Sequence, residues 1–281
     1  MKKLFSNILV PVDISNPSEY VIREAVELAR AFECNVHLLF LMPYYGSRYT
    51  HPRKWFKNEE DLNQRIVKIY SQHILHLPPP LRLHISIEKG RHENVVTSYA
   101  IKNYIDLLVL GRTYPLFSTG WFMQSGINRL SRKTGCPVLT LQSRSNLDRV
   151  RNIVMPVGSS FLPLRKLMFA TYLAKKYNSR LHLVTLSGKQ HDLDAGDNQY
   201  LLKAYRLIRD NTEVPVECIT LPGENIAAIT LQYAKDVKAD LIVINPGKES
   251  LLSGLVNRLF SRFLFNESRI PVMTVAPPVH S

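Results

Sequence analysis

The sequence has few cysteines, and their spacing forms no recognisable pattern. Only Cys34, Cys136 and Cys218 occur in 281 residues, each far from the others. A disulfide framework needs more cysteines, and structural zinc sites use closely spaced pairs such as C-x2-C. We therefore expect three reduced, buried cysteines, the usual state in a cytoplasmic protein.

Long hydrophobic runs are also absent. No apolar stretch approaches the ~18 residues of a membrane-spanning helix. The apolar run near the start of the chain ends at Asp13, which is too early for the hydrophobic region of a signal peptide. The sequence thus predicts a cytoplasmic protein without a membrane span.

Composition and charge are those of a globular chain. Hydrophobic residues make up 45% and charged residues 21%, and ~150 residues per domain predicts about two domains. The net charge of +13 is spread evenly, because residues 1–148 hold 19 basic and 12 acidic side chains and residues 149–281 hold 17 and 11. Such a charge favours loose contact with polyanions. No RRM, KH or helix-turn-helix pattern accompanies it, so nucleic-acid binding is not expected as the main function.

Three apolar segments occur twice in the chain, in the same order. The first recurs after 145 residues and the other two after 134 residues. Internal repetition of this kind indicates two copies of one structural unit. The segment pairs are residues 7–13 and 152–158, 106–110 and 240–244, and 137–141 and 271–275.

The repeated segments read as buried parallel strands, because they are short, apolar on both faces and rich in Val, Ile and Leu. Amphipathic helix patterns lie between them, the first opening near Asn16 and Pro17. We therefore predict an α/β fold of two Rossmann-like domains, each a five-stranded parallel sheet with helices on both faces. The domains are expected at residues 1–143 and 150–281, joined by a short polar linker. Further helices are expected near residues 59–76, 93–105, 121–133, 197–211, 224–238 and 251–265.

One connection is longer in the first copy than in the second. Residues 43–58 follow a predicted strand and are aromatic and basic. Loops at the carboxyl ends of strands lie where open α/β sheets bind ligands. The segment is therefore either a lid or partner-docking loop, or a surface loop or cover without a binding role.

The combined pattern resembles the universal stress protein family in its tandem, two-domain form. The resemblance rests on Val-Pro-Val-Asp at 10–13, Asp-Leu-Leu-Val-Leu-Gly at 106–111, the helix that follows, and Cys-Pro-Val-Leu at 136–139. It covers nearly the whole chain, twice. It implies two domains of the adenine nucleotide alpha hydrolase-like kind and a role in stress response.

The resemblance also implies how the two copies pair. In this family the closing strands of two domains pair antiparallel, which here would join residues 137–141 to residues 271–275 within one chain. Such pairing covers two apolar sheet edges that would otherwise aggregate. It leaves both a monomer and a further homodimer open.

Nucleotide-binding members of the family carry a loop of the form G-x2-G-x9-G-[ST] after the fourth strand, and an acidic residue at the end of the first. In the first copy Asp13 matches the acidic residue, Gly111 the first glycine and Ser125 the closing Ser/Thr. Tyr114 and Gln124 stand at the second and third glycine positions. A Cβ there restricts positive φ and fills space that the phosphates would occupy.

The second copy departs further from the nucleotide-binding pattern. Gly158 stands at the acidic position. The three glycine positions of the loop carry Asn245, Lys248 and Arg258. Lysine and arginine attract phosphate as charges, but the backbone cradle that glycines permit is missing.

No catalytic constellation or metal site is indicated. His73 and His76 are three residues apart on an expected helix, and a solvated helix face explains them without a metal. The strongest candidate for an anion site, against the alternative of a solvated basic face, is the cluster of Arg112, Arg129, Arg132 and Lys133.

We therefore expect a binding or regulatory protein of the stress response that does not use ATP through the family loop and has no cofactor or catalytic residue. One alternative is an ATP-binding switch or weak ATPase that uses the first copy alone, through Asp13, Gly111 and Ser125. A second is a polyanion- or partner-docking module that uses residues 43–58.

Overall fold

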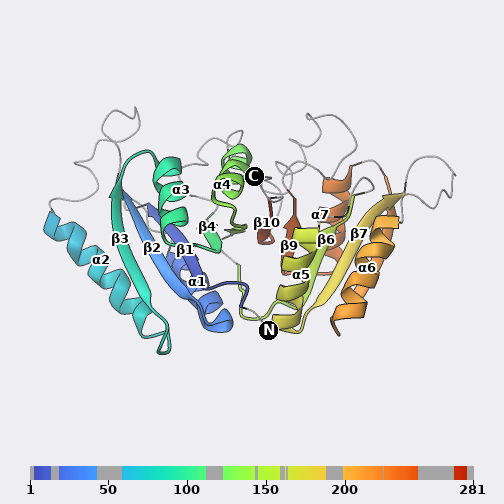
Figure 1. The fold of residues 1–281 in the computed structure, drawn as a ribbon, viewed down its shortest axis with the longest axis horizontal. Helices are drawn as coiled ribbons and strands as arrows, with labels where there is room; N and C mark the ends of the chain where they lie inside the picture. The colour runs from blue at the N-terminus through green and yellow to red at the C-terminus, as the bar shows by residue number, and fades with distance from the viewer. Residues whose placement is uncertain are drawn as a thin grey trace. The chain divides into compact units, whose positions relative to one another are not determined.

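The computed structural model describes residues 3–13, 19–42, 59–111, 123–142, 145–158, 162, 164–187, 199–223, 225–245 and 269–276. Strands and helices alternate within each copy, as the repeat predicts, except that no helix is described between the last two strands of the second copy (Figure 1). The first copy comprises β1 (Asn7–Asp13), α1 (Glu19–Phe32), β2 (Asn35–Met42), α2 (Glu59–Ile74), β3 (Leu83–Lys89), α3 (His92–Lys102), β4 (Leu107–Gly111), α4 (Met123–Thr134) and β5 (Val138–Leu141).

The second copy repeats this order along its described residues, which do not include the position of the last helix. It comprises β6 (Asn152–Pro156), α5 (Leu164–Tyr177), β7 (Arg180–Ser187), α6 (Gln199–Asn211), β8 (Val216–Pro222), α7 (Ile226–Asp236), β9 (Leu241–Ile244) and β10 (Val272–Thr274). Each copy supplies five strands, so the predicted α/β class is confirmed. The predicted helix near residues 251–265, the loop 43–58 and the cap at Asn16 lie outside the described residues.

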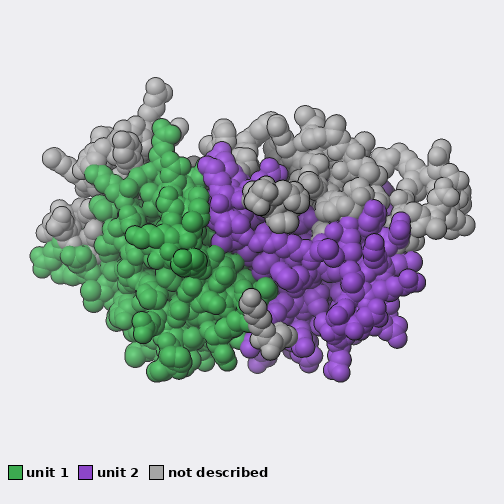
Figure 2. Space-filling view, in the orientation of Figure 1, with its two compact units in different colours: residues 1–118 green, residues 119–281 purple. Residues whose placement is uncertain are grey.

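The chain divides into two compact units, residues 1–118 and 119–281 (Figure 2). The first unit contains four parallel strands in the order β3-β2-β1-β4. Its central strands are mostly apolar and buried, with Ile8 opposite Val36 of β2 and Leu107 of β4. The domain limits that the repeat predicts, 1–143 and 150–281, stay a prediction.

The second unit contains the strands β5-β10-β9-β6-β7-β8. All neighbours in this series are parallel except β5 and β10, which pair antiparallel with Met273 opposite Leu139. The predicted pairing of the two closing strands is thereby confirmed. Ser131 of α4 ties the ends of these strands together, because its Oγ donates to the carbonyl of Cys136 at 2.7 Å and accepts from the amide of Ala276 at 3.3 Å.

The cysteines follow the prediction only in part. Cys34 and Cys136 are buried, as expected, but Cys218 is exposed. Cys218 lies on β8, the last strand in the order of the second unit, where alternate side chains face solvent. Within the described residues, no helix is both long and apolar enough to cross a membrane.

The N-terminus of α7 is capped by a side chain, and the contribution of this cap to stability can be tested. The side chain of Asn225 caps the helix, accepting from the amides of Ala227 and Ala228 at 3.1 Å each, whereas Arg91 at the matching position before α3 makes no side-chain cap bond. We expect Asn225→Ala to lower the free energy of unfolding by about 1 kcal/mol. Denaturant unfolding measures this loss. The control Arg91→Ala should leave stability nearly unchanged, and equal losses in both variants would contradict the assignment.

Candidate functional site

Two of the predicted site residues close adjacent parallel strands of the first unit. Asp13 is the last residue of β1 and Gly111, which is buried, is the last residue of β4. The strands pair in parallel, with Leu9 opposite Leu108. Parallel neighbours end at the same edge of a sheet, and that edge is where open α/β sheets bind ligands. The fold thus brings the acidic position and the first glycine position to one edge.

Two further site residues lie at the start of α4. Gln124 and Ser125 are the second and third residues of this helix, which groups with the second unit. The first backbone amides of a helix lack intrahelical acceptors and favour an anion. Arg112 and Tyr114 lie outside the described residues.

The basic residues of the predicted anion cluster lie along the same helix. Arg129, Arg132 and Lys133 belong to α4, and Arg132 and Lys133 are in its last turn. Positive charge there suits the negative end of the helix dipole. This position gives the two residues a structural role that needs no bound anion, and the anion site itself stays a prediction.

The matching edge of the second copy has different chemistry. Gly158 follows β6 where Asp13 ends β1, and Asn245, 5% exposed, follows β9 at the position of Gly111. Lys166 of α5 is completely buried and its Nζ donates to the carbonyl of Pro156, the last residue of β6. The residue at this position in α1 is the apolar Val21, also buried. The second copy therefore lacks a carboxylate at this edge and has a buried lysine amino group beside it.

The sequence predicts no metal-binding role for His73 and His76. His73 lies in the last turn of α2, and His76 follows this helix. Among the residues that the structure describes, no group of three or more His, Cys, Asp or Glu side chains could hold a metal ion. His76 is exposed, but His73 is half-buried rather than on a fully solvated face. Burial, and to a smaller extent His76, lower the pKa of His73.

Sequence reasoning missed a buried polar network in the first unit. The imidazole of His37, 6% exposed, lies between Tyr99 of α3 and Asn7 of β1. Its Nδ1 is 3.1 Å from the Tyr99 hydroxyl and its Nε2 is 3.4 Å from Asn7 Oδ1. His84 of β3 stacks on the ring, with 4.5 Å between centroids. Burial, and then the neighbouring His84, lower the pKa of His37 to about 4.

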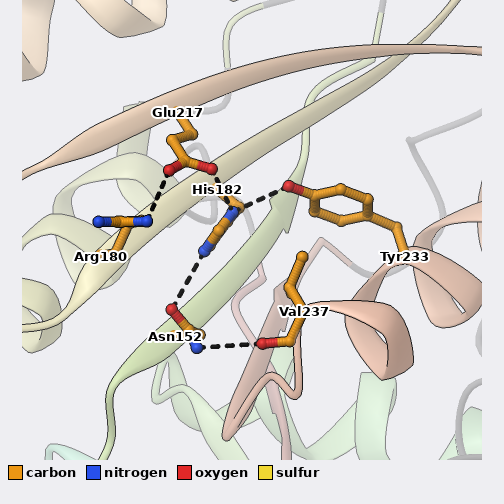
Figure 3. A network of polar contacts seen from close by, with 6 residues as sticks. All are labelled: Asn152, Arg180, His182, Glu217, Tyr233 and Val237. Atoms are coloured by element: carbon orange, nitrogen blue, oxygen red, sulfur yellow. Dashed lines mark hydrogen bonds and ion pairs between the residues drawn. The ribbon is translucent and has the colours of Figure 1, made fainter.

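The second unit contains the same network with one changed neighbour (Figure 3). The Nδ1 of His182 is 2.9 Å from the Tyr233 hydroxyl and its Nε2 is 3.3 Å from Asn152 Oδ1. Glu217 of β8 occupies the place of His84, with Oε2 3.3 Å from Nδ1 and Oε1 accepting from Arg180 at 2.8 Å. Burial lowers the pKa of His182, while the Glu217 carboxylate acts to raise it.

The network could have been found in the sequence by comparing polar residues at the same offsets as the repeated strands. His37 and His182 are 145 residues apart, and Tyr99 and Tyr233 are 134 apart, the same offsets as the repeated strands. The polar residues of the network face inward from strands that read as apolar, so hydrophobic patterning alone did not separate them. The network starts at the first residues of β1 and β6, the edge opposite Asp13 and Gly158.

The neutral state of His37 makes stability depend on pH. Unfolding returns its pKa from about 4 to 6.5, so the unfolded chain binds more protons in this window and stability falls as pH drops through it. Between pH 7 and pH 5 the loss from this residue is about 2 kcal/mol. Urea unfolding at the two pH values should show a smaller loss in His37→Gln than in the wild type. His76→Gln, which removes an exposed histidine, should keep the wild-type loss, and a loss as large in His37→Gln would contradict the account.

Comparison with known proteins places this geometry in a family. A family model described as the universal stress protein family matches residues 4–142. A universal stress protein from Archaeoglobus fulgidus DSM 4304 is similar over 99% of this chain and 100% of its own, with 12% identity and a TM-score of 0.72. A putative universal stress protein from Pseudomonas aeruginosa UCBPP-PA14 is similar over 97% and 94%, with 14% identity and a TM-score of 0.64.

The same fold occurs outside stress proteins. The cytoplasmic domain of a prokaryotic cation chloride cotransporter is similar over 96% of this chain and 95% of its own, with 13% identity and a TM-score of 0.53. No match was found among curated proteins. At these identities the solved structures show the shared fold, and the family model supplies the assignment. Residues 4–142 of this chain belong to the universal stress protein family, and the fold is shared with a solved universal stress protein over 99% of the chain.

Proposed function

We propose that this chain is a cytoplasmic stress-response protein that acts by binding a partner and does not use ATP through the family loop. On this account its two domains, residues 1–143 and 150–281, are both binding modules without a catalytic residue. A monomer and a homodimer are both compatible with the internal pairing of β5 and β10.

The observation that supports the proposal is the replacement of glycines in the first copy. Gly111 keeps the first position at the end of β4, but Tyr114 and Gln124 replace the other two. Gln124 is in the first turn of α4. Any residue other than glycine has a Cβ atom there, which takes up space that a phosphate would need for close approach to the backbone. A phosphate cradle needs backbone amides that a ligand can approach closely.

The second copy supports the proposal independently. Its sheet edge carries Gly158 in place of an acidic residue and the buried side chain of Asn245 in place of a glycine. Gly158 has no side chain, so the carboxylate that would accept hydrogen bonds from a nucleoside is missing at this position. The buried Lys166 at this edge donates to the Pro156 carbonyl, so this amino group already bonds the protein's own backbone.

One arrangement favours a second candidate, a nucleotide-dependent switch or weak ATPase in the first copy. Asp13 and Gly111 close neighbouring strands at one edge, as a nucleotide site of this family requires. Ser125 keeps the closing position of the loop. This candidate requires binding of ATP and slow phosphate release, both dependent on Asp13.

Calorimetric titration of Mg²⁺ and ATP into the full chain separates the two candidates. We expect no binding heat in the submillimolar range, because the loop lacks two of its three glycines. The titration is repeated with Asp13→Ala and with Asp210→Ala, which removes an exposed carboxylate of α6. Circular dichroism checks that all three proteins are folded.

If binding heat does appear, the two variants show whether the nucleotide binds at Asp13 or elsewhere on the chain. Submillimolar binding that is lost in Asp13→Ala and kept in Asp210→Ala would overturn the proposal and establish the first copy as a nucleotide site. Binding that survives in both variants would place a nucleotide away from Asp13, which contradicts the second candidate and agrees with a family loop that does not use ATP.

A further inference from the structure

The two buried histidines are held in the same protonation form by the same neighbours. In the second unit the Asn152 amide donates from Nδ2 to the carbonyl of Val237 at 3.0 Å, which turns its Oδ1 toward His182 (Figure 3). An oxygen there accepts only, so Nε2 of His182 carries the proton. The neutral ring then has its lone pair on Nδ1, which accepts from the hydroxyl of Tyr233.

The first unit repeats this logic. Asn7 donates from Nδ2 to the carbonyl of Tyr104 at 3.3 Å, so its Oδ1 faces Nε2 of His37. The Nδ1 of His37 then accepts from the Tyr99 hydroxyl, which is itself 3.1 Å from Ser86 Oγ. Because burial lowers the pKa of both histidines, the two rings are neutral near pH 7. In this state each ring is protonated on Nε2 and bonded through Nδ1 to a tyrosine of a packed helix.

The two histidine networks differ in the residue that the neighbouring strand places beside the ring. His84 is the register partner of His37 on β3, and Glu217 is the register partner of His182 on β8. The Glu217 carboxylate is 3.3 Å from a nitrogen that has no proton to give while the ring is neutral. It gains a charge-assisted hydrogen bond only when Nδ1 is protonated. His84 offers the opposite, since a second imidazole disfavours a positive charge on His37.

Among the described residues, four polar side chains lie around His182, including its neighbour Glu217. Glu217 faces it from β8, Tyr233 from α7 and the uncharged Asn152 from β6, while Arg180 of its own strand holds Glu217. Arg180 opposes a charge on His182 and Glu217 favours one. Burial keeps the ring neutral near pH 7, and acid adds the proton.

We propose that His182 and Glu217 form a proton-responsive latch between β7, β8 and α7, which the matching site of the first unit lacks. Protonation from solvent on Nδ1 turns this nitrogen from an acceptor of the Tyr233 hydroxyl into a donor to Glu217 Oε2. The Tyr233 hydroxyl then no longer donates to the ring. It competes for the Nδ1 proton with the Glu217 carboxylate, which is the stronger acceptor, so the contact between α7 and β7 weakens. The second unit thus loosens in acid at a pH at which His37 is still neutral.

The direct test is histidine titration by NMR on the full chain labelled at its histidines. In the folded wild type, we expect His182 to titrate at a higher pH than His37. Glu217→Gln should move the His182 midpoint to lower pH, toward that of His37. The reciprocal change His84→Glu places a carboxylate at the matching position of β3, and it should move the His37 midpoint to higher pH.

The reciprocal pair keeps the test decisive. If Glu217→Gln does not fold, the titration of His37 in His84→Glu decides the case. This variant tests whether adding a carboxylate raises the titration midpoint of the histidine in the first unit. Equal midpoints for His37 and His182 in the wild type, or an unchanged His37 in a folded His84→Glu variant, would overturn the proposal.

A second measurement separates a latch from a merely buried histidine. Amide hydrogen exchange along α7, compared with that along α3, reports the loosening of each helix. After correction for the intrinsic pH dependence of exchange, acid should reduce protection in α7 before α3 in the wild type. This order should be lost in Glu217→Gln, and simultaneous loss of protection in both helices of the wild type would contradict the latch.

Discussion

Parallel strand pairing is the constraint on which the rest of the structure depends. The apolar runs of β1 and β4 pair in register inside the first unit, and β6 and β9 do so inside the second. This pairing buries residues such as Ile8 and Ile153 completely, and it makes neighbouring strands end at a common edge. The same arrangement therefore aligns Asp13 with Gly111 at one edge and begins the histidine networks at the other.

The two copies share the same arrangement of strands and helices along their described residues but differ in the side chains at both edges of the sheet. At the carboxyl edge, Asp13 of the first copy is matched by Gly158, and a buried Lys166 replaces Val21. At the amino edge, His84 is matched by Glu217 while the histidine, tyrosine and asparagine around it are retained. Single-residue differences on a common backbone thus place different side chains at both edges of the two copies.

Much of this fold could be predicted from the sequence, since buried parallel strands leave uninterrupted Val, Ile and Leu runs and the repeat shows each run twice. The edge position of Asp13 and Gly111 followed from strand ends alone. The exposure of Cys218 was not predicted, because a strand at the edge of a sheet reads like its neighbours. The His182 network was missed because its members come from four separate elements, which only the folded chain brings together.

The central claim is that missing glycines, and not a different fold, separate this chain from ATP-using relatives. The most direct measurement is Mg²⁺ and ATP affinity, by titration calorimetry, of the wild type and a variant that carries Tyr114→Gly and Gln124→Gly. We predict that the wild type does not bind in the submillimolar range and that the restored loop does, because glycines reopen the backbone to phosphate. Equal binding by the two proteins would contradict the account.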